Sequence, residues 1–133
     1  EVFDTLLALA QEVIIWGGNY FDLPISRGWL VWSKPERGFT LAEAELAWTN
    51  KDTVIRVFDG PRSDPDRKHP TQKPLSVMLW SVSKTQGEVI LDPFMGSGTV
   101  AVASVLSGRE YIGSEISSEY CALAESEVLG IWS

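Results

Sequence analysis

A twelve-residue stretch, VILDPFMGSGTV at residues 89–100, constrains the fold of this chain more than any other segment. An apolar run ends at Asp92 and a proline, two glycines follow at Gly96 and Gly98, and a second apolar run begins after Thr99. Proline and closely spaced glycines interrupt a strand, and glycine supplies the positive φ that a tight turn requires. The stretch therefore predicts a strand, a glycine-rich turn and a helix, in that order.

The same stretch predicts a ligand site. A turn between a strand and a helix presents backbone N–H groups and the positive end of the helix dipole, and open α/β sheets bind ligands at the carboxyl ends of their strands. Asp92 suits a ligand that carries a cation or an amine, and Phe94 supplies an apolar wall. The letters GSGTVA also match the dinucleotide fingerprint, with Glu115 as a candidate ribose acceptor. A tight turn with an incidental aspartate is the structural alternative.

Other apolar runs continue the alternation of strands and helices. Thr40 followed by Glu43 matches the capping-box pattern, and Pro74 suits a first helical turn. Strands are expected at residues 13–16, 28–34, 53–58, 88–92 and 110–115, and helices at residues 1–12, 38–50, 75–82, 97–107 and 117–129. Short connections between these elements predict the α/β class, with a mostly parallel sheet in a three-layer sandwich.

Size and composition predict one domain in a reducing compartment. With 133 residues, 44% of them hydrophobic, the chain can bury the core of one ordinary domain. No apolar run approaches the roughly 20 residues of a membrane span, and no leader pattern precedes the first expected helix. We therefore expect a soluble, cytoplasmic protein with no membrane partner. Cys121 is the single cysteine and His69 the single histidine, so neither a disulfide nor a metal site is expected.

Charge is distributed unevenly along the chain. The net charge of −7 disfavours a protein that binds nucleic acid over its whole surface. Residues 51–73, however, hold six basic side chains against four acidic ones. That segment is either a surface that faces phosphates or a solvated loop, and composition leaves both interpretations open.

Several motifs resemble one enzyme family. DPFMGSGT is similar to the cofactor motif of DNA amino-methyltransferases, which use S-adenosylmethionine to methylate the exocyclic amino group of adenine or cytosine. RKHPTQKP at residues 67–74 resembles the segment that precedes this motif in the permuted beta class. The central region of small phage-type members resembles IIWGGNYF, GWLVWSK and FTLAEAELAWTN, so the resemblance covers nearly the whole chain. It implies a Rossmann-like methyltransferase fold, truncated at its amino end.

The resemblance also implies roles for individual residues. The implied residues of an S-adenosylmethionine site are Thr71, Lys73, Asp92, Phe94, Gly96, Gly98, Thr99 and Glu115. The residues implied to line the pocket of the target base are Asn19, Tyr20 and Phe39, for which turn formation and core packing are the structural alternatives. Within one partial methyltransferase domain at residues 1–133, the segment 1–50 is expected to form the target-base half, 51–73 a basic loop region and 74–133 the cofactor half.

The catalytic motif of the permuted class is absent from the sequence. Its usual form, Asp-Pro-Pro-Tyr, orients the target amino group and stacks on the flipped base, and this chain contains no Pro-Pro pair. We therefore expect no catalytic residue here, and cofactor binding with little or no methyl transfer by the chain alone. The implied partner is double-stranded DNA, and uncovered strand surface would favour a homodimer.

Two other functions remain open at the level of sequence. A non-catalytic relic or regulator of the same fold would bind DNA through residues 51–73, and an NAD-dependent oxidoreductase would rest on GSGTVA alone. Within the methyltransferase hypothesis, the resemblance to phage-type members favours adenine over cytosine. The target sequence in DNA does not follow from any motif.

Overall fold

The computed structural model describes residues 2–35, 38, 40–61 and 73–132. The chain divides into two compact units, Glu1–Pro61 and Arg62–Ser133, and each unit has its own sheet. The boundary between the units lies inside the segment 51–73 that was expected to be a basic loop region. None of the helices in the described ranges is both long enough and apolar enough to span a membrane.

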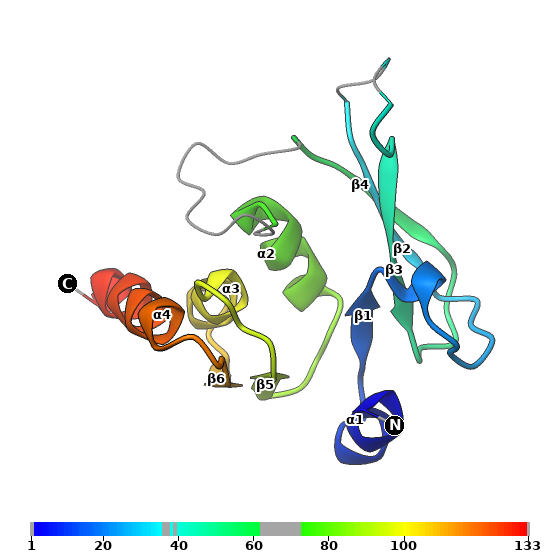
Figure 1. The fold of residues 1–133 in the computed structure, drawn as a ribbon. Coiled ribbons are helices and arrows are strands. Elements are labelled where there is room, and N and C mark those ends of the chain that lie inside the picture. The colour runs from blue at the N-terminus through cyan, green and yellow to red at the C-terminus, as the bar shows by residue number, and fades with distance from the viewer. Residues whose placement is uncertain (1, 36–37, 39, 62–72, 133) are drawn as a thin grey trace. The chain divides into compact units, whose positions relative to one another are not determined.

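The described residues of the first unit form a four-stranded sheet and one α-helix. Along the chain they contain α1 (Val2–Leu9), β1 (Ile14–Trp16), the 3-10 helix η1 (Gly18–Tyr20), β2 (Leu30–Ser33), β3 (Ala44–Thr49) and β4 (Arg56–Asp59). The strands follow the order β1-β3-β2-β4 across the sheet. β3 runs antiparallel to β1 and β2, whereas β4 runs parallel to β2 (Figure 1). The three strands expected at 13–16, 28–34 and 53–58 are confirmed to within a few residues.

The helix expected at residues 38–50 is wrong, because residues 44–49 of that segment form strand β3. Its alanine, leucine and glutamate residues favour a helix locally, but β3 is hydrogen-bonded to a strand on each side, and this pairing outweighs the intrinsic propensity. Thr40, the expected helix cap, lies in a bend before the strand. Because β3 is antiparallel to both neighbours, two of the four strand pairs in the described residues are antiparallel, where a mostly parallel sheet was expected.

One cluster of buried side chains in the first unit includes Trp48 of β3. Trp48 is 2% exposed and packs with the buried side chains of Val13 and Ile15. Its indole N–H donates to the Pro24 carbonyl at 2.7 Å, so the buried ring leaves no polar group unsatisfied. Partly buried side chains that cover this cluster are Phe3, Leu7, Ala10, Leu23 and Trp29.

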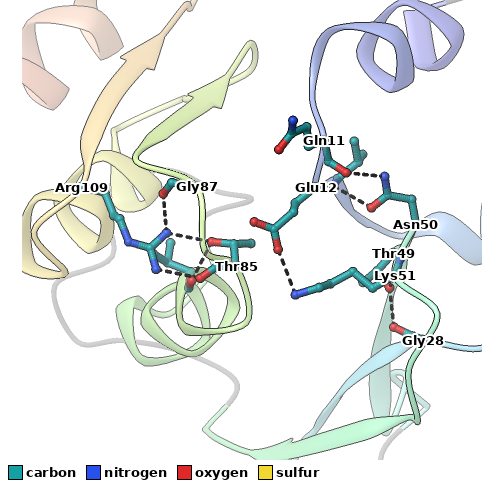
Figure 2. A network of polar contacts seen from close by, with 11 residues as sticks. Gln11, Glu12, Gly28, Thr49, Asn50, Lys51, Thr85, Gly87 and Arg109 are labelled. Carbon is teal, nitrogen blue, oxygen red and sulfur yellow. Dashed lines mark hydrogen bonds and ion pairs between the residues drawn. The ribbon is translucent and has the colours of Figure 1, made fainter.

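Polar contacts join the segment before β1 to the end of β3 (Figure 2). The Asn50 side chain accepts a hydrogen bond from the Val13 N–H and donates one to the Gln11 carbonyl, both at 2.9 Å. Next to them, Lys51 forms an ion pair with Glu12 at 2.9 Å. These contacts complete the edge of the sheet and give the side chain of Asn50 a structural role.

Residues 73–132, the described part of the second unit, combine three helices with a pair of parallel strands. They contain α2 (Leu75–Ser83), β5 (Val89–Asp92), α3 (Thr99–Leu106), β6 (Glu110–Gly113) and α4 (Ser118–Trp132). β5 and β6 pair in parallel, and α3 packs against α2, α4 and β6 (Figure 1). The strand, turn and helix predicted from VILDPFMGSGTV are confirmed, as are the helix after Pro74 and the final helix.

Small side chains bring the helices of this unit close together. The buried residues of α2, α3 and α4 include Val77, Ala101, Ala103, Ser104 and Ala124. A Cβ atom added to Gly98 would lie 2.6 Å from the Cβ of Ala124, and Gly98 has a φ of 91°. Glycine is required at this position both by the left-handed backbone and by the approach of α4.

Arg109 forms hydrogen bonds at the amino ends of the paired strands β5 and β6. The Arg109 guanidinium donates to the Gly87 carbonyl at 2.8 Å, and to the carbonyl and hydroxyl oxygens of Thr85 at 2.7 and 3.0 Å (Figure 2). These bonds hold the connection between α2 and β5 against the beginning of β6. The amino ends of β5 and β6 are thereby fixed by hydrogen bonds to a charged donor.

Candidate cofactor site

The turn after β5 is bound to the end of β6 by backbone hydrogen bonds. The Ser114 N–H donates to the Asp92 carbonyl at 3.0 Å, and the Met95 N–H donates to the Ser114 carbonyl at 3.0 Å. The Ser114 hydroxyl adds a bond to the Pro93 carbonyl at 2.6 Å. The carboxyl ends of two parallel strands therefore meet in one hydrogen-bonded edge.

Glu115 braces this edge with its side chain. One carboxylate oxygen accepts the Gly96 N–H at 3.1 Å, and the other accepts the Ser117 N–H at 2.8 Å. The first bond fixes the glycine turn, and the second fixes the chain just before α4. A carboxylate has about four acceptor positions, so Glu115 keeps capacity for hydroxyl donors of a ligand.

Helix α3 begins directly after the glycine turn. Gly96 and Gly98 have φ values of 54° and 91°, and Gly98 is the N-cap residue of α3. A glycine cap offers no side chain to accept from the first-turn N–H groups, and Thr99 is the first residue of the helix. The N–H groups and the positive end of the helix dipole therefore favour an electron-rich group of a ligand.

Asp92 is held in a polar but poorly solvated position at the end of β5. Burial raises the pKa of its carboxyl group, hydrogen bonds from the Phe94 N–H and the Tyr111 hydroxyl oppose that rise, and the negative charge of Glu115 adds to it. The two hydrogen bonds are 3.1 and 3.4 Å long. A cation that approaches a carboxylate in this position stabilises its charged form, because the cation compensates for lost hydration.

The structure brings together most of the residues predicted for the cofactor site. Asp92 ends β5, Phe94, Gly96 and Gly98 lie in the turn that follows, Thr99 begins α3, and Glu115 is the second residue after β6. Phe94 is 72% exposed. Lys73 belongs to the same unit, is half-buried and lies directly before Pro74. Thr71 lies outside the described residues.

The residues predicted for the target-base pocket lie in the first unit. Asn19 and Tyr20 form part of η1, directly after β1, and both are exposed. The Tyr20 side chain is 81% exposed, which disfavours the alternative that it is a packing aromatic. Phe39 lies outside the described residues.

Sequence reasoning missed three residues of this edge: Ser114, Ser117 and Tyr111. Ser117 follows the pattern of a helix cap, since its hydroxyl accepts the Tyr120 N–H at 3.3 Å, and that signal was available from the sequence. Ser114 acts through its backbone and hydroxyl, so no residue pattern indicates it. The Tyr111 hydroxyl reaches Asp92 from the neighbouring strand, and only the pairing of β5 with β6 reveals that contact.

These features define a class of protein. Two carboxylates follow neighbouring parallel strands, a glycine turn leads into a helix, and donors and acceptors converge at one edge, as in α/β proteins that bind a nucleotide-containing cofactor. Within the described ranges, no three histidine, cysteine or carboxylate side chains are grouped to hold a metal ion.

Comparison with known proteins makes the class specific. The family model described as DNA methylase matches residues 22–126, which is most of the chain. The chain therefore belongs to the DNA methylase family.

Curated relatives agree with the family assignment. Type II methyltransferase M2.MboI of Moraxella bovis is 32% identical over 128 residues, a match that covers 72% of this chain and 47% of that protein. DNA adenine methyltransferase YhdJ of Escherichia coli K12 is 43% identical over 70 residues, which cover 48% of this chain and 24% of that protein. The chain spans less than half the length of either relative.

A solved structure confirms the fold class. The crystal structure of the complex of M1.HpyAVI with SAM matches with a TM-score of 0.62 and 27% identity, over 78% of this chain and 62% of that one. The chain thus has the Rossmann-like α/β fold of DNA methyltransferases, as its motifs implied.

Proposed function

We propose that this chain binds S-adenosylmethionine at the turn between β5 and α3, and that it forms the cofactor-binding part of a DNA methyltransferase. The single observation that carries the proposal is the edge where Asp92 and Glu115 flank the glycine turn, within a segment matched by the DNA methylase family model. The same match favours S-adenosylmethionine over a nicotinamide dinucleotide, although GSGTVA suits both.

The residues present fit this cofactor chemically. Asp92, whose carboxyl is short of solvent, suits the cationic methionine portion, and Glu115 has acceptor positions left for the two ribose hydroxyls. The exposed Phe94 supplies an apolar surface, and Gly98 allows the left-handed backbone and the close approach of α4 that shape the turn. When bound, S-adenosylmethionine supplies an activated methyl group. Thr71 and Lys73 are proposed to complete the pocket.

The proposed substrate of the intact protein is double-stranded DNA, methylated at the exocyclic amino group of a base. Adenine is favoured over cytosine, which agrees with the adenine specificity named for YhdJ. Asn19, Tyr20 and Phe39 are proposed to line the base pocket, and the basic segment 51–73 to face phosphates. On this proposal both units belong to one methyltransferase domain, in which 1–50 serves the base and 74–133 serves the cofactor.

We expect this chain to have only one of the two activities, cofactor binding without methyl transfer. Its residues can orient a methyl donor, but the sequence contains no Asp-Pro-Pro-Tyr motif to orient the acceptor amino group. We expect the 133-residue chain to bind the cofactor and to transfer little or no methyl to DNA. Methylation of DNA by the purified chain, abolished by Asp92→Ala, would contradict this part of the proposal.

Calorimetric titration with S-adenosylhomocysteine tests the binding proposal. We expect a Kd in about the micromolar range, near −8 kcal/mol. Asp92→Ala and Glu115→Ala should each weaken binding by roughly tenfold or more, because each removes a charged hydrogen-bonding partner.

The matched control is Glu119→Ala, which removes an exposed carboxylate in the first turn of α4 and should leave the Kd unchanged. Absence of binding by a folded chain, or equal weakening by all three variants, would refute the proposed site. Binding of NAD in place of S-adenosylhomocysteine would favour the oxidoreductase alternative.

A further inference from the structure

Asp92 shares one face of the strand pair with a tyrosine and a glycine of β6. In the parallel register, Ile90 lies opposite Tyr111 and Asp92 opposite Gly113. Side chains alternate along a strand, so these four residues point to the same face, and all four are half-buried. The residues of the other face, which include Leu91 and Ile112, are exposed.

Gly113 leaves room for the ring of Tyr111. A Cβ atom added to Gly113 would lie 2.6 Å from the hydroxyl oxygen and from the Cε2 atom of Tyr111, and 2.6 Å from the Met95 sulfur. Gly113 is not among the glycines with positive φ, so backbone conformation does not require glycine here. The requirement is steric, because the tyrosine ring occupies the space that a side chain at 113 would fill.

This arrangement brings a hydroxyl to the neighbouring strand. The Tyr111 hydroxyl donates to Asp92 Oδ2 at 3.4 Å, and the Phe94 N–H donates to Asp92 Oδ1 at 3.1 Å. Each carboxylate oxygen therefore has one protein donor, which fixes the orientation of the side chain. A bond of 3.4 Å is long for a hydroxyl donor, and such bonds commonly shorten when a ligand binds.

The electrostatic surroundings assign the direction of this bond. Burial and the negative charge of Asp92 raise the pKa of Tyr111 above its ordinary value, so the phenol stays protonated and acts as the donor. Among the described residues, the titratable groups that act on Asp92 are Tyr111 from β6 and Glu115 from the segment after it. Tyr111 favours the ionised form of the Asp92 carboxyl, whereas burial and Glu115 oppose it.

We propose that Tyr111 is a positioning residue for the cofactor site, whose hydroxyl, reaching across the space left by Gly113, orients the Asp92 carboxylate for a cationic ligand. The inference rests on the proposed function for the identity of that ligand. The contact between Tyr111 and Asp92 is a property of the free protein, however, and is open to a separate test.

The first experiment measures the free chain. The Asp92 carboxyl carbon is titrated by NMR in the wild type and in Tyr111→Phe, which keeps the ring and removes the hydroxyl. The proposal expects the titration midpoint of Asp92 to move to higher pH in Tyr111→Phe. Ile112→Val, on the exposed face of the same strand, is the control and should leave the midpoint in place.

The second experiment measures binding of S-adenosylhomocysteine as a function of pH. In Tyr111→Phe, binding should weaken about three- to tenfold near neutral pH. The pH below which binding weakens should move to a higher value, by the same amount as the titration midpoint of Asp92. Gly113→Ala should act in the same direction, because its methyl group displaces the tyrosine ring, and combining both variants should add little to either one.

The outcomes separate the two proposals. An unchanged Asp92 midpoint in Tyr111→Phe, or weakening by the same factor at every pH, would overturn the positioning role while leaving the cofactor site in place. A shifted midpoint in a chain that binds no S-adenosylhomocysteine would support the contact between Tyr111 and Asp92 and refute the proposed function.

Discussion

Each end of the β5–β6 strand pair holds a charged side chain, Arg109 at the amino end and Asp92 at the carboxyl end. The surroundings stabilise the charge of Arg109 and oppose that of Asp92. At the amino end, Arg109 donates three hydrogen bonds to oxygens of the α2–β5 connection, so acceptors of the protein itself stabilise its charge. At the carboxyl end, burial of Asp92 opposes its ionisation, and only two donors partly compensate. The amino end is built for stability, whereas the carboxyl end retains an unfavourable charge that a cationic ligand can relieve.

The largest expected effect on stability comes from the glycines at the two ends of α3, the helix that connects the carboxyl end of β5 to the amino end of β6. Gly98 and Gly108 both have positive φ, at 91° and 73°. A Cβ at Gly98 meets Ala124 at 2.6 Å, whereas a Cβ at Gly108 meets nothing within 4 Å. Gly108→Ala should therefore lose only about 1–2 kcal/mol of unfolding free energy from backbone strain. Gly98→Ala should lose about 1–3 kcal/mol more from overpacking.

Urea denaturation measures both losses, and titration with S-adenosylhomocysteine shows where they act. Gly98→Ala should also weaken binding, because it moves the beginning of α3, and Gly108→Ala should not. Equal losses of stability in the two variants would mean that contact with α4 contributes nothing to the requirement for glycine at 98.

Removal of the arginine tests the amino end. Arg109→Met keeps much of the side-chain length and abolishes three hydrogen bonds from a charged donor, so the free energy of unfolding should fall by about 2 kcal/mol. The Kd for S-adenosylhomocysteine should stay the same. Arg27→Met is the control, because its ion pair with Asp52 is exposed and should contribute less than about 1 kcal/mol. A changed Kd in Arg109→Met would show that the two ends are coupled.

Neutralisation of the aspartate has the smallest expected effect on stability and the opposite sign. Asp92→Asn should raise the free energy of unfolding at neutral pH by no more than about 1 kcal/mol, while binding of S-adenosylhomocysteine falls by roughly tenfold or more. Gain of stability with loss of binding is the expected mark of a functional carboxylate. Loss of both would instead place Asp92 among the residues that hold the fold.

The pH dependence of that difference follows from the raised pKa of Asp92. The folded chain binds this proton more tightly than the unfolded chain, so Asp92 favours folding below its ordinary pKa and loses that contribution as pH rises through the raised pKa. The stability advantage of Asp92→Asn should therefore be near zero in acid and grow as pH rises. Chemical denaturation of both chains across this range measures it.

Features that depend on neighbours along the chain were predictable from the sequence. Proline and glycine interrupt a strand wherever they occur, so the strand, turn and helix around Asp92 could be predicted from twelve letters. The helix after Pro74 follows the same local rule. The motifs also pointed to the DNA methylase family, to which the chain belongs.

Features that depend on partners far along the chain were not predictable. Residues 38–50 have a helical composition, yet residues 44–49 form β3 because they pair with a strand on each side. Glu115 was predicted at a strand end, but its bond to the Gly96 N–H, nineteen residues away, exists only because β5 and β6 pair. The same pairing brings the Tyr111 hydroxyl to Asp92.

The sequence by itself thus determined the family, the position of the glycine turn and the identity of both carboxylates, because these depend on residue type and local spacing. The tertiary structure decided which backbone groups Glu115 holds, how strongly burial opposes the charge of Asp92 and which hydroxyl reaches it. Hydrogen bonds and desolvation depend on distances in space, and strand pairing sets those distances between residues that the sequence keeps apart.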